Sequence, residues 1–379
     1  MRKNFRTLLA LSGLAALSSP SLFATSYVQT NLVSDLSSVG AVTVDPNLKN
    51  PWGVSFSATS PFWVSNQATD TSTLYTGAGT KLNLTVTVPP ATPPPAGPTG
   101  QVQNSAGAGN FVVNGSPASF IFDTLSGTIN AWNSSTGTSA TAVTTTPGAV
   151  YTGLALGNNG TANYLYAANF ATGGGINVFD NTFTQVNSTT FAGKFVDPKL
   201  PAGYAPYNVQ LIGSNLYVEY AEVGTRGPIT GTGLGYVDVY DLNGNLVSRL
   251  ISGSALNAPW GVTLAPASFG QFSNDLLVGN FGDGTINAFD PSTGAFLGTL
   301  ANGNGTAIVN QGLWALDFRT NGGSGSVPNG LYFTAGINGE TDGLFGYIAP
   351  APEPSVYGLA GCGFLAIGAL AWRRRRKAA

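Results

Sequence analysis

The chain of 379 residues repeats one short sequence plan along most of its length. The two closest copies are NPWGVSF, from Asn50, and APWGVTL, from Ala258. Weaker copies are GSPASFIF from Gly115, YTGLALG from Tyr151, APYNVQL from Ala205 and QGLWALDF from Gln311. The later openings recur at roughly 54 residues, and a fixed internal period of this size is typical of arrays of one structural unit. The simplest count is six units.

Each opening is followed by segments that alternate apolar and polar residues. The second segment reads FWVSN, YLYAANF or NLYVEY, and the third reads GTINAWN, GGINVFD or GTINAFD. Alternation in period two between Gly, Asn and Asp turns predicts short antiparallel strands. Phe179, Tyr240 and Phe289, which stand before the turns, are expected in the core.

Repeated units of three or four strands cannot bury both faces alone, but radial stacking does so. Gly 51, Pro 23 and only 8% charged residues also favour short strands over helices. The sequence therefore predicts an all-β fold, a β-propeller of six blades, over residues 25–349.

Two segments stand outside the repeat. YVQTNLV, from Tyr27 to Val33, alternates, and we expect it to add a strand to the last blade and close the ring. The Pro- and Gly-rich residues 89–110 are expected to form an extended insertion loop, either a surface insertion or a partner contact.

The first 24 residues read as a secretory signal peptide. Arg2, Lys3 and Arg6 precede an apolar run from Leu8 to Leu17, and Ala24 is a small residue at a position suited to cleavage. The body is therefore expected to be exported.

Residues 350–379 form a separate tail. Pro352, Glu353 and Pro354 precede 17 uncharged residues, 356–372, which are just long enough for a transmembrane helix. The basic cluster that follows favours a cytoplasmic end and a body held outside; it consists of Arg373, Arg374, Arg375, Arg376 and Lys377.

The order of these three parts resembles the PEP-CTERM sorting tail of exported bacterial proteins. The resemblance implies recognition by an exosortase, which cuts near Pro352–Pro354, and release or transfer of the body to the cell surface or extracellular matrix. A permanent membrane anchor without processing is the alternative.

The body resembles NHL-type propellers in its Pro-x-Gly-Val strand openings and its Gly-x-Ile-x-Val-Phe-Asp segments. The stretch from Asn31 to Phe56 also resembles an uncharacterised family of exported bacterial propeller-like proteins. These resemblances imply fold and export, with no established activity.

Charge and composition exclude several chemistries. Without the two terminal segments the chain keeps seven basic against 16 acidic residues, so a nucleic-acid partner is not expected. The sequence has no histidine, and its one cysteine, Cys362, lies in the tail; catalytic triads with histidine and thiol catalysis by the body are therefore excluded.

A possible binding site involves the ends of the second strands. Asn66, Asn169 and Asn280 occupy matching places, and Glu219 and Glu222 follow the same plan in the fourth unit. If these ends converge at one mouth of the central channel, the ring of amides and carboxylates could bind calcium or a sugar, as in some six-bladed lactonases. Alternatively, the Asn residues only turn the chain and Glu219 faces solvent.

Two other motifs have two interpretations each. Trp52, Trp260 and Trp314 stand at equivalent places and form either a sugar-stacking platform or packing between adjacent blades. Asp241 to Ser248, DLNGNLVS, is read as a β-turn rather than a calcium loop, because it lacks the Gly and the late Glu of an EF-hand.

Three functions follow from these patterns. The first is a non-enzymatic surface propeller that needs no cofactor and binds polysaccharide or protein through one face. The second is a calcium-dependent lactonase or hydrolase, and the third is a structural surface-layer component. No catalytic residue is assigned.

Overall fold

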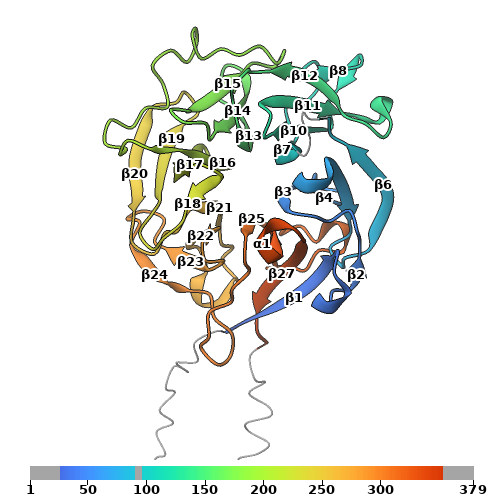
Figure 1. The fold of residues 1–379 in the computed structure, drawn as a ribbon, viewed down its shortest axis with the longest axis vertical. Helices are drawn as coiled ribbons and strands as arrows, with labels where there is room; N and C mark the ends of the chain where they lie inside the picture. The colour runs from blue at the N-terminus through green and yellow to red at the C-terminus, as the bar shows by residue number, and fades with distance from the viewer. Residues whose placement is uncertain (1–25, 90–95, 353–379) are drawn as a thin grey trace, which may run out of the picture.

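A computed structural model describes residues 26–89 and 96–352. Six antiparallel sheets stand around a central axis, as Figure 1 shows, so the predicted six-bladed β-propeller is confirmed. The innermost strand of every blade lines the axis. These strands are β3 (Pro51–Ser55), β7 (Pro98–Gln103), β13 (Tyr151–Asn158), β16 (Tyr204–Ile212), β21 (Pro259–Leu264) and β25 (Leu313–Phe318).

The second and third strands of each blade follow in chain order towards the outside. The second strands are β4 (Phe62–Asn66), β10 (Phe120–Thr124), β14 (Asn163–Asn169), β17 (Asn215–Gly224), β22 (Leu276–Asn280) and β26 (Leu331–Ala335). The third strands are β5 (Thr71–Tyr75), β11 (Thr128–Trp132), β15 (Ile176–Phe179), β19 (Tyr236–Asp241), β23 (Ile286–Phe289) and β27 (Leu344–Pro350).

Five blades have a fourth, outermost strand, whereas the sheet of the third blade has three strands in the described chain. The outermost strands are β6 (Lys81–Thr87), β12 (Thr141–Thr145), β20 (Leu246–Ser252), β24 (Phe296–Thr299) and β1 (Tyr27–Ser34). Short additions are β2 (Thr43–Val44), β8 (Val112–Val113), β9 (Ser116–Pro117), β18 (Gly227–Ile229) and the single helical turn α1 (Ile337–Glu340).

The ring is closed by the N-terminal strand, as the sequence predicts. β1 pairs antiparallel with β27, from Tyr27 opposite Pro350 to Ser34 opposite Leu344. The last blade therefore combines strands from both ends of the described chain, and pairing with β1 covers the edge of β27.

The core consists of apolar clusters between neighbouring blades and one around the axis. Phe179, Tyr240 and Phe289 are fully buried in the interblade clusters, so their predicted core positions are confirmed. The Asp241 motif forms the β19–β20 turn, in which the carboxylate accepts hydrogen bonds from the backbone of Asn243 and Asn245.

The expected insertion loop at 89–110 is wrong for part of its length. Residues Pro98–Gln103 form β7, the innermost strand of the second blade. GSPASFIF, interpreted as an opening, instead forms β9 and the start of β10. Polar contacts hold β7, because the Thr99 hydroxyl and the Gly100 amide both donate to Asp123 Oδ1, and a search for apolar alternation does not detect such a strand.

The terminal predictions fall largely outside the described residues. Pro352 is the last residue described, and the signal segment 1–24, Glu353, Pro354, the span 356–372 and Arg373 to Lys377 lie beyond. Within residues 26–89 and 96–352, no helix is long and apolar enough to cross a membrane.

Candidate functional site

Irregular pairing at the start of the innermost strands shapes the centre of the ring. The register between first and second strands shifts after Pro51, Tyr151, Pro206, Pro259 and Leu313. A bulge of this kind re-aims the side chain of the extra residue. The extra residues include Trp52, Thr152, Tyr207, Trp260 and Trp314, whose side chains meet at one end of the channel.

Four of these side chains pack on one another across the axis. The rings of Trp52 and Trp314 are stacked with centroids 3.5 Å apart, and Trp260 lies edge-on to both at 6.1 and 5.8 Å. Tyr207 contacts Trp52 and Trp314 edge-on at 6.3 and 5.9 Å. The prediction that the tryptophans pack between adjacent blades is therefore confirmed, because Trp314 of the sixth blade contacts Trp52 of the first and Trp260 of the fifth in one buried cluster.

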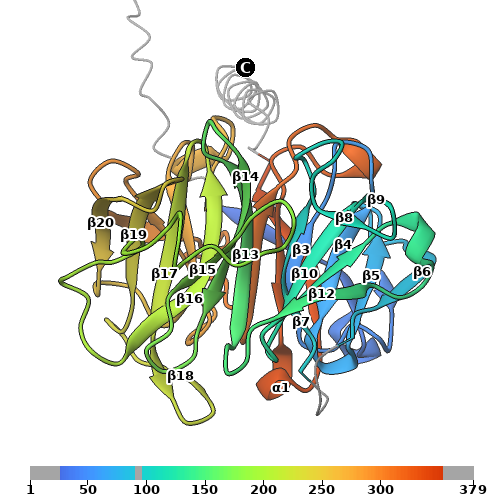
Figure 2. The ribbon, with the colours of Figure 1, turned by 90° about the horizontal axis from the view of Figure 1, so that it is seen from above.

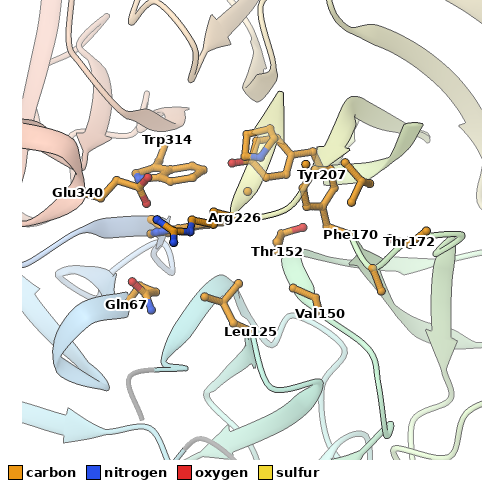
Figure 3. Close-up of a pocket in the computed structure, with 16 residues that line it drawn as sticks. Gln67, Leu125, Val150, Thr152, Phe170, Thr172, Tyr207, Arg226, Trp314 and Glu340 are labelled. Atoms are coloured by element: carbon orange, nitrogen blue, oxygen red, sulfur yellow. The ribbon is translucent and has the colours of Figure 1, made fainter. Parts of the chain in front are cut away.

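The aromatic rings form the floor of a cavity of about 460 Å³, which we call the aromatic cavity. Its floor consists of Trp52, Phe170, Tyr207 and Trp314, all at least nine-tenths buried. In Figure 3, Trp314 and Glu340 lie on one side of this cavity and Tyr207 and Phe170 on the other. Besides Trp52, Tyr207 and Trp314, the lining residues with charged or hydrogen-bonding side chains are Gln67, Thr152, Thr172, Arg226 and Glu340.

A buried asparagine fixes three groups around the aromatic cavity. Asn50 Nδ2 donates to Gln67 Oε1 at 2.9 Å and to Glu340 Oε2 at 3.1 Å. Asn50 Oδ1 accepts from Trp314 Nε1 at 2.9 Å. Because Asn50 is 2% exposed, this network orients the carboxylate, the amide and the indole before any ligand arrives.

Glu340 reaches the cavity from a strained turn. Asn338, Gly339 and Glu340 have φ values of 54°, 66° and 68°, all in the left-handed region. A glutamate there costs about 1–3 kcal/mol, and strain of this kind gathers at ligand sites. Burial raises the pKa of the Glu340 carboxyl, and the hydrogen bond from Asn50 opposes this shift.

Arg226 and Tyr207 offer hydrogen-bond donors to the same cavity. Arg226 is exposed at the tip of the β17–β18 hairpin and forms none of the ion pairs seen among the described residues. Burial, and to a smaller extent the charge of Glu340, raise the pKa of the Tyr207 hydroxyl well above its usual value, so it stays protonated.

The second strands do end at the mouth that holds the aromatic cavity, but the predicted Asn side chains hydrogen-bond locally. Asn66 Nδ2 donates to Thr73 Oγ1 at 2.9 Å, Asn169 Oδ1 accepts from the Val150 amide at 2.9 Å, and Asn280 Oδ1 accepts from the Asn257 amide at 3.0 Å. The residue after each Asn lines a cavity instead: Gln67, Phe170 and Phe281.

The two predicted glutamates do not line the aromatic cavity. Glu219 is fully buried on β17, opposite Asn208 and Val237, and neither of its carboxylate oxygens has a hydrogen-bond partner. Glu222 is partly exposed, opposite Tyr204. The described part of the chain holds no group of three or more His, Cys, Asp or Glu side chains that suits a metal ion. The calcium site stays a prediction.

The sequence predicts only part of the polar lining of the cavity. Arg226 is expected near the predicted ring of amides and carboxylates and does line the cavity, whereas Asn50 enters only as part of the repeat and no motif indicates Gln67 or Glu340. The signal for Glu340 is the Asn338-Gly339 pair, which favours left-handed conformations directly before it. The signal for Gln67 is its place directly after a second strand.

A second cavity, of about 320 Å³, opens at the other end of the channel. Ser55, Gln101, Gln210 and Asp317 line it from four innermost strands. Burial raises the pKa of Asp317 to about 7. The two mouths thus differ, since the surface of the first is mostly apolar and that of the second mostly polar.

Solved structures that are similar to this chain include two bacterial proteins. A protein of unknown function from Bacteroides thetaiotaomicron has a TM-score of 0.50 and 13% identity, over 85% of this chain and 76% of that one. The soluble aldose sugar dehydrogenase of Escherichia coli has a TM-score of 0.48 and 13% identity, over 86% and 100%. At 13% identity, the likeness to the Bacteroides protein shows the fold alone.

The sequence relatives are closer. No protein-family model matches the chain. An uncharacterized protein of Acanthamoeba polyphaga mimivirus is 34% identical over 334 residues, covering 84% of this chain and 78% of its own length. A second uncharacterized protein of the same virus is 32% identical over 321 residues, covering 81% of both. At this identity and coverage, the chain belongs to one protein family with these two mimivirus proteins.

Proposed function

We propose that this protein is a non-enzymatic binding protein whose propeller holds a neutral saccharide in the aromatic cavity. The observation that carries the proposal is the arrangement at one mouth of the channel, where an aromatic floor lies beside the prearranged Glu340 and Gln67. A volume of about 460 Å³ is ordinary for a small-ligand site.

Aromatic rings beside fixed acceptors suit a sugar in particular. The apolar face of a sugar ring packs on an aromatic surface, and its hydroxyl groups donate to carboxylate and amide oxygens. Glu340 Oε1 is not engaged by Asn50, which bonds Oε2. The carboxylate therefore keeps an oxygen for a ligand hydroxyl.

Binding fits the cavity better than hydrolysis does. Glycoside hydrolysis ordinarily requires two carboxylates that flank the scissile bond, and Glu340 is the one acidic residue among those that line the aromatic cavity. Histidine, the most frequent general acid or base, is absent from the sequence.

Binding to the aromatic cavity is best tested with the full chain, purified in a detergent that carries no sugar. Tryptophan fluorescence and calorimetry measure the binding of three probes: cellohexaose, laminarihexaose and isomaltohexaose. We expect at least one probe to bind, and Glu340→Gln to weaken it about tenfold, the value of a hydrogen bond to a charged group.

Glu222→Gln is the matched control, because it makes the same change on a partly exposed glutamate outside the cavity. It is expected to leave binding unchanged. The absence of binding by all three probes, or equal affinities for the native chain and Glu340→Gln, would overturn the proposal.

We further propose that the body is exported and that an exosortase recognises Pro352, Glu353 and Pro354. β27 ends at Pro350 beside the start of β1, on the face opposite α1, as Figure 2 shows. An anchor that follows Pro352 would thus leave the aromatic cavity facing away from the membrane. Cell fractionation tests this: replacing Arg373 to Lys377 by Ser should reduce retention in the membrane, and unchanged retention would count against the anchor.

A further inference from the structure

We infer that the aromatic cavity is one end of a longer groove, and that its ligand is a chain of several neutral sugar units rather than a single sugar. This inference rests on the proposed function. It is carried by a neighbouring cavity of about 480 Å³, here called the outer cavity, which is lined by Thr230, Phe281, Asp283, Val309, Gln311 and Glu340.

The two cavities share one side wall, and the opposite wall of one lies next in the chain to that of the other. Glu340 lines the aromatic cavity and the outer cavity, so the α1 turn forms one wall of both. On the other side, Pro228 of β18 lines the aromatic cavity and Thr230, two residues further, lines the outer cavity. A ligand chain can therefore run between the α1 turn and β18 from one cavity into the other.

The aromatic floor also continues between the cavities. Phe281 lines the outer cavity, and its ring centroid lies 4.4 Å from that of Trp314, which lines the aromatic cavity. Phe281 is only partly buried, in contrast to Trp314 at 1% exposure. Successive sugar rings would thus meet successive aromatic side chains.

The charge of the outer cavity favours a neutral polysaccharide over an acidic one as the ligand. Asp283 and Glu340 are its charged lining residues, and no Lys or Arg is among the residues that line it. Asp283 is held in place because its Oδ2 accepts from Asn257 Nδ2 at 3.1 Å. Since like charges across an interface are costly, an acidic polysaccharide is disfavoured, whereas the hydroxyl groups of a neutral chain can donate to both carboxylates.

Affinity as a function of chain length tests the groove. Calorimetry on the full chain measures the affinity for the disaccharide and for the hexaose of three neutral series: cello-, laminari- and isomalto-oligosaccharides. Hexagalacturonate is the acidic oligosaccharide for comparison. We expect the hexaose of the bound series to bind about tenfold more tightly than its disaccharide, and hexagalacturonate to bind more weakly than that hexaose.

Two bulky substitutions at the rim block the outer cavity independently. Thr230 and Val309 are both exposed, so Thr230→Trp and Val309→Trp should fold normally. Each should lower the affinity for the hexaose to that of the disaccharide. Val247→Trp, at a residue 59% exposed on β20, is the matched control and should leave the hexaose affinity unchanged.

The outcomes separate the two proposals. If neither disaccharide nor hexaose of any series binds, the proposed function fails. If disaccharide and hexaose bind equally, or if both rim variants keep the full hexaose affinity, the aromatic cavity remains the binding site and the groove is refuted. Tighter binding of hexagalacturonate would overturn the assignment to a neutral chain.

Discussion

Glu219 is a fully buried carboxyl group that has no hydrogen-bond partner for either oxygen. Burial raises its pKa well above the usual range. In the unfolded chain the pKa of a glutamate is about 4.3. At pH values between this pKa and the higher pKa of folded Glu219, the folded state therefore binds more protons than the unfolded state. The free energy of unfolding therefore falls as pH rises through this window.

We expect the native protein to be more stable near pH 5 than near pH 8. Asp123 and Asp317 act in the same direction, because burial raises the pKa of each to about 7. Glu219→Gln removes one titrating group and should reduce this loss by about 1.4 kcal/mol for each pH unit between 5 and 8 that lies below the folded pKa of Glu219. Urea unfolding at the two pH values measures both.

Glu222→Gln is again the control, since it removes a partly exposed carboxylate from the same strand. It should leave the difference in stability between pH 5 and pH 8 close to that of the native chain. A native protein that is equally stable at both pH values would contradict the assignment of buried, protonated carboxyls.

At the scale of the elements, the innermost strands pack backbone against backbone. A Cβ added at Gly53 would lie 2.5 Å from the carbonyl oxygen of Thr99 in the next blade, and one added at Gly261 would lie 2.4 Å from that of Trp314. Both contacts join neighbouring blades, so these glycines set how closely the six strands approach the axis.

Gly261→Ala should therefore force the fifth and sixth blades apart and cost about 1–3 kcal/mol of stability, the usual cost of overpacking. Gly175→Ala is the matched control, because a Cβ there meets no atom within 4 Å. Denaturant midpoints of the two variants give the comparison. Equal midpoints would show that the blades accommodate the added methyl group of Gly261→Ala without a loss of stability.

The repeat predicts the elements well where side chains are large and apolar. It fails at β7, where Thr99 and Gln101 make polar contacts instead. The signal there is Pro98-Thr99-Gly100, which has the same Pro-x-Gly form as Pro51-Trp52-Gly53.

The candidate site was harder to predict than the fold. The ends of the second strands predict at which end of the channel the site lies. The bulges that turn Trp52 and Trp314 into the channel cannot be predicted, because they do not change the alternation of apolar and polar residues. The position of Glu340 depends on a left-handed turn, and its hydrogen bond to Asn50 joins residues 290 positions apart. Local patterns do not report contacts at that separation.

At the scale of the whole molecule, the pairing of β1 with β27 joins the two ends of the described chain in the last blade. Val33 is fully buried on β1, opposite Phe345, whereas Val28 on the same strand is 52% exposed. Val33→Asp buries an unpaired charge at the closing strand and should cost on the order of 3 kcal/mol or more, while Val28→Asp should be close to neutral.

Because each blade packs on the next, the loss of closure should spread around the ring rather than stay in the last blade. Hydrogen exchange followed by mass spectrometry distinguishes these cases. In Val33→Asp we expect faster exchange in peptides from β10 and β14 as well as from β26 and β27, with Val28→Asp matching the native protein. Faster exchange confined to β1, β26 and β27 would show that the blades unfold independently and that closure by β1 stabilises only its own sheet.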